Sequence, residues 1–398
     1  MDILLIGLGT ILLLALLATA MAERTVLPRV TLLLLLGVIS GPPLLNLIPA
    51  DLVAQFGVIA EITLLMVGFL IGGKLSHHSF SHGGRQVVAI SLMAAIFTVL
   101  TVTLGLMLLG LSWEIATVLG CIAAATAPTA VLDVVSQITA DAGPRRRFGD
   151  LLLGISALDD VWALLLFGIG LALATAGQGD GGSPLAPLLW AGRDLGGGAL
   201  VGLAVGLPAA LLTGRIRAGQ PMLLEALGIV LLCGGLASRF EVSYLVAAMV
   251  MGAVVANLAR HHDYPFHAIE GIELPFMALF FVLAGASLDP GSLARIGGVG
   301  LAYVLLRTAG KIWGAAAGAQ LAGSDALTRR WVGAALLDQA GVAVGMALVA
   351  NERLPDLSGP VLSIAIASTV VFELVGPPLV RLALTRFRDS PDAPLPAC

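Results

Sequence analysis

The sequence predicts an all-α membrane protein with about thirteen transmembrane helices. Of its 398 residues, 58% are hydrophobic and only 12% are charged, and the mean hydropathy is +1.00. Soluble domains carry roughly 25% charged residues, so a soluble chain of this size would have no place for so much apolar surface. An apolar segment in lipid must satisfy its own backbone hydrogen bonds, which favours helices. The small net charge of -4 gives no indication of nucleic-acid binding.

Apolar segments long enough to cross a bilayer, at about 20 residues each, follow one another along the whole chain. We predict spans at residues 2–21, 27–48, 51–71, 86–111, 113–138, 148–174, 192–213, 220–238, 241–259, 268–287, 294–322, 331–350 and 359–385. The first segment lacks the basic start of a signal peptide, so we expect it to be retained. The glycine-rich residues 176–184 are expected to form a flexible connection between the sixth and seventh spans.

Lysines and arginines are concentrated on alternate connections between the predicted spans. Fifteen of the 21 lie on odd-numbered connections or the C-terminal end, four lie on even-numbered connections, and Arg307 and Lys311 lie within a span. Because cytoplasmic loops carry the excess of positive charge, we expect the N-terminus outside and the C-terminus in the cytoplasm. A miscount of one helix would break this alternation.

Two adjacent acidic residues, Asp159 and Asp160, lie in the middle of the apolar segment 151–174. A carboxylate at bilayer depth is energetically costly, and such groups usually mark an ion path or a proton relay. No basic residue is close to them in sequence, so their partners must come from other helices. The two residues are therefore the first candidates for an ion-binding site.

Two segments have the features of interrupted helices. Residues 123–133 contain a proline, which removes a backbone hydrogen bond, and residues 336–348 contain two glycines. Discontinuous helices in corresponding places of two halves indicate the binding site of a transporter. The predicted orientation makes one run inward and the other outward, as in an inverted repeat that pairs helices 2–6 with helices 9–13. The polar residues of these segments are Thr126, Thr129, Asp133, Asp338 and Gln339.

The predicted span 294–322 carries two basic residues. Lys311 lies near mid-depth, and Arg307 lies one turn before it on the same helix face. A buried lysine needs a counter-ion to stay charged, and Asp159 or Asp160 is the nearest acid at that depth. Arg307 is expected either to extend to the membrane interface or to pair with the buried Glu373 of the last span.

The histidines occur only on two predicted cytoplasmic connections. They are His77, His78, His82, His261, His262 and His267. We expect solvated loop residues, with a cytoplasmic pH sensor as the alternative, because histidine titrates near neutral pH.

Six motifs occur along the chain in an order that is shared with a known family. They are IAEITLLMVGFLIGGKL (59–75), TAPTAVLDVV (126–135), ALDDVWALLLFG (157–168), ELPFMALFFVLAGASLD (273–289), RTAGK (307–311) and FELVGPPLV (372–380). With them the chain resembles the cation:proton antiporter superfamily over nearly its whole length. It is most similar to the electrogenic branch with two aspartates, typified by the NapA and NhaA sodium/proton antiporters.

The resemblance implies a fold of inverted repeats in which two discontinuous helices cross at their unwound centres. It also implies a core, ion-transporting domain of helices 4–6 and 11–13, at residues 86–174 and 294–385. Helices 1–3 and 8–10, at residues 1–71 and 220–287, would form a dimerisation domain, and helix 7, at residues 192–213, would link the two. A homodimer is expected on the same ground.

The function implied by the resemblance is secondary transport, not enzyme catalysis, and it needs no cofactor. Protons would exchange for a monovalent cation, with Na⁺ favoured, in a bacterial plasma membrane, as part of pH homeostasis. Asp160 would bind the cation with help from Asp159, Thr126 and Thr129, and Lys311 would couple the proton through a salt bridge. The supporting residues would be Arg307, Glu373, Asp133, Asp338 and Gln339. Two protons per sodium ion would make the exchange electrogenic.

Two other functions remain as alternatives. A potassium/proton antiporter of the same superfamily would use the same residues, and its cytosolic nucleotide-binding domain is not expected here. A cation channel would give currents far above carrier turnover without obligatory proton coupling. An intramembrane aspartyl protease fits poorly, since adjacent residues on a helix point about 100° apart.

Overall fold

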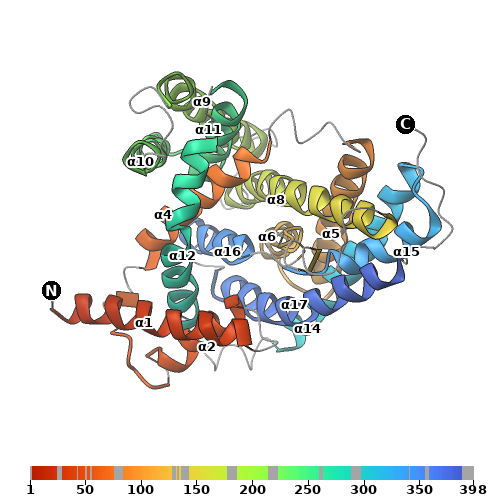
Figure 1. Cartoon of the computed structure of the whole chain (residues 1–398), viewed down its shortest axis with the longest axis horizontal. Helices are drawn as coiled ribbons and strands as arrows, with labels where there is room; N and C mark the ends of the chain where they lie inside the picture. Colours follow the sequence, from red (N-terminus) through yellow and green to blue (C-terminus); the bar gives the residue numbers. More distant parts are fainter. Residues whose placement is uncertain are drawn as a thin grey trace.

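The structure is a computed structural model in which the chain is almost entirely helical. It describes residues 2–24, 29–42, 44–49, 52–53, 56–75, 84–127, 131, 134–135, 143–176, 186–213, 223–259, 263–287, 297–339, 341–354 and 358–387. The helices in these ranges are α1 (Asp2–Arg24), α2 (Arg29–Ser40), α4 (Phe56–Gly73), α5 (Gly84–Leu108), α6 (Trp113–Ala123), α8 (Pro144–Ala176), α9 (Ala186–Leu212), α10 (Leu223–Arg239), α11 (Tyr244–Leu258), α12 (Asp263–Ala286), α14 (Gly297–Leu321), α15 (Ala326–Ala335), α16 (Val342–Arg353) and α17 (Ser358–Arg386). Figure 1 shows their arrangement.

Seven helices of the described chain are long and apolar enough to cross a membrane, judged by length and composition. They lie in α1, α4, α5, α8, α9, α12 and α17. Shorter apolar helices, among them α2 and α6, lie between them. An all-helical membrane protein is confirmed, and the count of thirteen spans stays a prediction.

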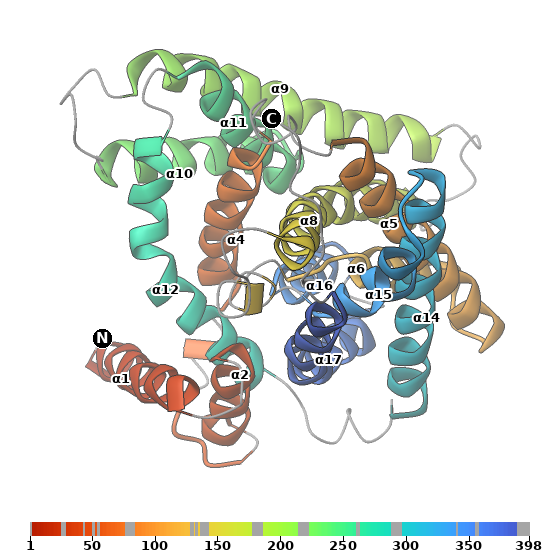
Figure 2. The ribbon, with the colours of Figure 1, turned by 45° about the vertical axis from the view of Figure 1, so that its right-hand side comes forward.

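The helices pack in two groups that lie side by side (Figures 1 and 2). In one group α14 packs along α5, α6 lies against α5 and α8, and α15 and α16 contact α17. In the other group α11 packs on α9 and α4, and α12 packs on α2 and α4. The candidate ion-binding side chains all come from the first group.

Two predicted spans are interrupted in the structure. In the span at 113–138, α6 ends at Ala123, the described residues 125–127 are non-helical, and residues 131, 134 and 135 are helical again. The span at 331–350 is divided into α15 and α16, with residues 337–339 non-helical. Both interruptions were predicted from the proline and the glycines. The span at 27–48 is shorter than predicted, because α2 ends at Ser40 and a turn comes after it.

The close packing of α14 on α5 depends on three glycines spaced four residues apart, at positions 310, 314 and 318. A Cβ atom on Gly310 would lie 2.7 Å from the Cα atom of Thr98, and one on Gly314 would lie 2.6 Å from the carbonyl oxygen of Met93. Small residues at such a spacing allow helix backbones to approach closely in membranes. This contact fixes the helix that carries Arg307 and Lys311.

We expect Gly314→Ala to lower the apparent melting temperature of the detergent-solubilised protein. The added methyl group would have to displace the α5 backbone, and overpacking of this kind costs about 1–3 kcal/mol. Gly300→Ala is the matched control on the same helix, since a Cβ atom there meets nothing within 4 Å. Equal melting temperatures for the two variants, measured by tryptophan fluorescence, would show that this contact does not constrain the fold.

Candidate functional site

The two interrupted helices meet at their non-helical segments, in the interior of the first group. The N–H group of Ala127 donates a hydrogen bond to the carbonyl oxygen of Asp338 at 3.4 Å. The side chain of Asp325 caps the start of α15 by accepting hydrogen bonds from two backbone N–H groups, at 3.1 Å each. At their other ends, α6 and α15 present backbone carbonyl groups to the same buried region.

Arg307 of α14 joins the two non-helical segments. Its guanidinium donates hydrogen bonds to four carbonyl oxygens: those of Ala123 at 3.0 Å, Ala125 at 2.8 Å, Leu337 at 2.6 Å and Asp338 at 3.2 Å. The side chain is fully buried, and its Cζ atom lies 4.1 Å from the ring centre of Phe372. The planar guanidinium holds several donors in a fixed geometry, so it can satisfy several acceptors at once. The donors of a lysine ammonium are less fixed in direction.

Lys311 lies one turn further along α14 and makes the contact that the sequence predicted. Its Nζ atom forms an ion pair with Oδ2 of Asp159 at 2.6 Å, and both side chains are fully buried. The same Nζ atom donates to Oγ1 of Thr126 and to the carbonyl oxygen of Ala124, each at 2.7 Å. The hydroxyl of Thr126 donates in turn to Oδ2 of Asp159 at 2.8 Å.

Asp160 is the next residue along α8 and is only 2% exposed. Its Oδ1 atom is buried without a hydrogen-bond partner, and the same is true of Oδ1 of Asp159. Buried polar atoms are usually hydrogen-bonded, so each unpartnered oxygen needs a physical explanation. Lys74 follows the last residue of α4, in the other group of helices, and its positive charge attracts the carboxylate of Asp160.

The remaining predicted residues are distributed around this centre. Asp338 and Gln339 lie in the break before α16, and both are buried. The predicted pairing of Arg307 with Glu373 is wrong: Glu373 accepts a hydrogen bond from Thr31 at 3.0 Å, and Arg307 uses its donors on backbone carbonyls. Thr129 and Asp133, and five of the six histidines, lie outside the described residues. The ring of His267 contacts the carbonyl oxygen of Asp263, one turn earlier on the same helix.

Sequence reasoning expected the backbone carbonyls of the interrupted helices to help bind the cation, but it missed that those of residues 123–125 and 337–338 accept hydrogen bonds from Arg307 and Lys311. It also missed two side chains. Tyr303 lies one turn before Arg307 on α14 and is fully buried. A tyrosine in register with two mid-span cations was a signal that could have identified it. Thr31 was missed because its predicted helix belonged to the other group.

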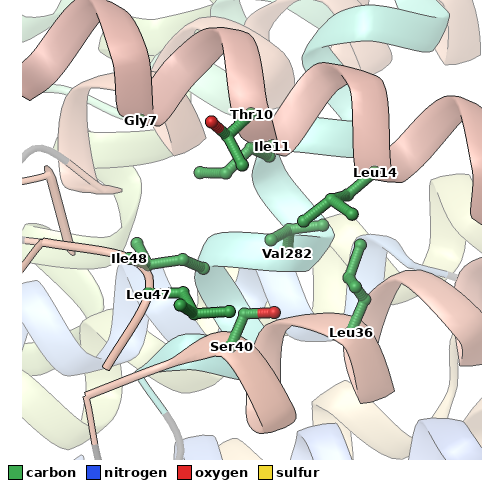
Figure 3. Close-up of a pocket in the computed structure, with 9 residues that line it drawn as sticks. All are labelled: Gly7, Thr10, Ile11, Leu14, Leu36, Ser40, Leu47, Ile48 and Val282. Carbon is green, nitrogen blue, oxygen red and sulfur yellow. The ribbon is translucent and has the colours of Figure 1, made fainter. Parts of the chain in front are cut away.

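A small pocket lies elsewhere, between α1, α2 and α12 (Figure 3). Its lining is mostly aliphatic, with Leu14, Leu36 and Val282 facing each other, and the hydroxyl groups of Thr10 and Ser40 are its polar side-chain atoms. None of the described residues that line it is charged. A pocket of this composition offers no counter-charge to a cation, so it is not part of the candidate ion site.

Comparison with known proteins identifies the family. The model of the transmembrane region of the sodium/hydrogen exchangers matches residues 11–382, so the chain belongs to this family of cation/proton antiporters. The K⁺/H⁺ antiporter subunit KhtU of Bacillus subtilis (strain 168) is 23% identical over 320 residues, which are 78% of this chain and 76% of KhtU.

A second relative is the glutathione-regulated potassium-efflux system protein KefC of Klebsiella pneumoniae (strain 342). It is 26% identical over 397 residues that cover 94% of this chain and 59% of KefC, so the chain spans less than two thirds of that protein.

The structure of the sodium proton antiporter MjNhaP1 from Methanocaldococcus jannaschii at pH 8 superposes with a TM-score of 0.76 at 20% identity, over 96% of this chain and 98% of that one. This likeness confirms the antiporter fold.

We expect Arg307→Lys to destabilise the protein while keeping the charge. A lysine ammonium cannot reach all four carbonyl groups, and each buried acceptor left without a donor costs about 1–3 kcal/mol. The melting temperature in detergent should therefore fall by several degrees. The control is Arg330→Lys on α15, where the side chain is exposed. If both variants have the melting temperature of the wild type, Arg307 does not hold the interrupted helices together.

Proposed function

We propose that the chain is a secondary active antiporter that exchanges protons for Na⁺ by alternating access. The observation that carries this proposal is the buried cluster of Lys311, Asp159 and Thr126 at an interrupted helix, next to the unpartnered carboxyl oxygen of Asp160. Ionisable residues at bilayer depth usually serve transport. Here they lie where two discontinuous helices expose backbone carbonyls, as transporter binding sites do.

In this proposal Asp160 is the direct ligand of the cation. Hard cations prefer oxygen ligands, and the surroundings supply the carboxyl groups of Asp159 and Asp160 and the hydroxyl of Thr126. Thr129 would add a second hydroxyl. Protons compete with the cation for the same carboxylates, so each occupant excludes the other. That competition is the basis of exchange.

Lys311 would couple the second proton to the cycle. A cation at Asp160 would weaken the ion pair between Lys311 and Asp159, and its departure would restore the pair. Because the two aspartates interact strongly, they would titrate as one system. If two protons exchange for one sodium ion, one net charge moves in each cycle, and the membrane potential then contributes about 2.3 kcal/mol per 100 mV.

Alternating access would come from movement of one group of helices against the other. We assign residues 86–174 and 294–385 to the moving core, residues 1–71 and 220–287 to a dimerisation domain, and residues 192–213 to the connection. The separate packing of α5 with α14, of α11 with α4 and of α12 with α2 supports this division. We further propose a homodimer in a bacterial plasma membrane, with the C-terminus in the cytoplasm, from the bias of lysine and arginine.

A potassium/proton antiporter is the second candidate. The observation that favours it is the similarity to KhtU, named as a K⁺/H⁺ antiporter subunit, and to KefC, named as a potassium-efflux system protein. The same oxygen ligands serve both cations. A cation channel is a weaker alternative, because a buried lysine that forms an ion pair beside the site would hinder free diffusion of cations.

Asp160→Asn is expected to reduce cation-driven proton flux to the level of protein-free liposomes, because the amide carries no charge to hold the cation. Reconstituted protein would be tested with Na⁺, Li⁺ and K⁺ gradients and a pH-sensitive dye, so that the wild type also identifies the preferred cation. The matched control is Asp150→Asn on the same helix, whose carboxylate is 53% exposed and pairs with Arg146. Full flux in Asp160→Asn would reject the site.

Lys311→Ala is expected to separate charge movement from exchange. Without the lysine, Asp159 has no counter-ion and would keep its proton, so exchange would continue with one proton per cation. Current on a solid-supported membrane should then vanish while dye-detected proton flux persists. A variant that retains a current proportional to its proton flux would contradict the proposed role of Lys311 and leave that of Asp160 intact.

A further inference from the structure

A second pair of acidic side chains is buried outside the Lys311 cluster. Asp338, in the break between α15 and α16, is 1% exposed, and Glu373 on α17 is 6% exposed. The side chain of Asp338 packs against Gly376: a Cβ atom there would lie 2.6 Å from its Cβ atom and 2.8 Å from its Cγ atom. Since Gly376 lies one turn after Glu373, Asp338 packs on the helix face that carries Glu373, and the two carboxyl groups repel each other as like charges.

The two carboxyl groups differ in their partners. Oδ1 of Asp338 accepts a hydrogen bond from the backbone N–H group of Gln339 at 3.1 Å, but its Oδ2 atom is buried without a partner. The side-chain amide of Gln339 is also buried, with neither polar atom hydrogen-bonded. Among the described residues, neither carboxyl group forms an ion pair.

The helix that carries Glu373, α17, contacts α2 of the other group of helices (Figure 2), and the first turn of α2 holds the Glu373 side chain. The hydroxyl of Thr31 donates to its Oε2 atom at 3.0 Å, and the backbone N–H group of Thr31 also faces it. The N-terminus of a helix has unpaired N–H groups and favours an anion. Glu373 is therefore the member of the pair whose carboxyl group has a side-chain hydrogen-bond donor.

Two basic residues lie near the pair, and among the described residues neither forms an ion pair with it. Arg307 of α14 acts on Asp338, but its hydrogen bonds go to backbone carbonyl oxygens, including that of Asp338 itself. Arg29, at the start of α2, acts on Glu373 and is exposed. Ionising both buried carboxyl groups without a paired cation is costly, so we expect one of the two to hold a proton.

We propose that Asp338 and Glu373 form a second proton-binding site, separate from Asp159 and Asp160. One proton is held on the unpartnered oxygen of Asp338, while Glu373 remains a carboxylate anchored by Thr31. Because Thr31 and Glu373 belong to different groups of helices, occupancy of this site depends on the contact between α2 and α17. The site does not depend on which cation is exchanged.

Infrared difference spectroscopy of the reconstituted protein between acidic and alkaline pH tests this proposal without requiring transport. The expected result is a protonated-carboxyl band that titrates with pH in the wild type and in Asp160→Asn, and that is lost in Asp338→Asn. Asp150→Asn, which removes an exposed carboxylate, is the control and should keep the band. A titrating band that is unchanged in Asp338→Asn, or a spectrum whose only titrating band is lost in Asp160→Asn, would overturn the proposal.

Thr31→Val provides a second test that leaves every carboxyl group in place. Removing the donor to the Glu373 carboxylate should make the pair hold its proton more tightly, so the midpoint of the same band should move to higher pH, by about one unit or more. Ser363→Ala, on the same helix as Glu373, is the comparison for a hydroxyl removed elsewhere and should leave the midpoint in place. An unmoved midpoint in Thr31→Val would show that the site is not linked to α2.

Discussion

The structure depends on one constraint: an interrupted helix at bilayer depth leaves carbonyl groups without backbone donors. The ends of α6 and α15 present such groups together, and α14 supplies the donors. Arg307 satisfies four carbonyl oxygens and Lys311 a fifth. The C-terminal end of a helix also carries a partial negative charge, so two cations are favoured there. The positive charges at the centre are thus required by the backbone before any ion binds.

This constraint explains why the carboxyl groups lie where they do. Lys311 uses one donor on Ala124 and directs its charge to Asp159, with Thr126 between them. The geometry of the ion pair is therefore set by the break in the helix. The close contact of the α14 glycines with α5 fixes the position of the helix that carries Arg307 and Lys311. A shift of the segment after α6 would change the hydrogen bonds of Lys311 and the field at Asp159 and Asp160 together.

The sequence was sufficient to predict two features of the site. A lysine in the middle of a span needs an acidic partner, and Asp159 was one of two candidates. The proline and the glycines indicated where the two helices are interrupted. The role of Arg307 was not predictable, because pairing charges by residue type ignores backbone acceptors, and Glu373 found a hydroxyl and a helix N-terminus instead. The length rule for spans failed at α2, which ends at Ser40 with a turn after it.

The charges buried in the centre do not balance, and that imbalance is the physical reason for exchange. The acidic side chains are Asp159, Asp160, Asp338 and Glu373, and the buried basic ones are Arg307 and Lys311. With every group ionised, two carboxylates would remain without a counter-charge in a region of low dielectric constant, where an unpaired charge costs several kcal/mol. Two positive charges must therefore enter, as protons or as metal cations. In the proposed function Asp160 would accept either kind of charge, so the centre would exchange one for the other whenever it opens to a side where the competitor is in excess.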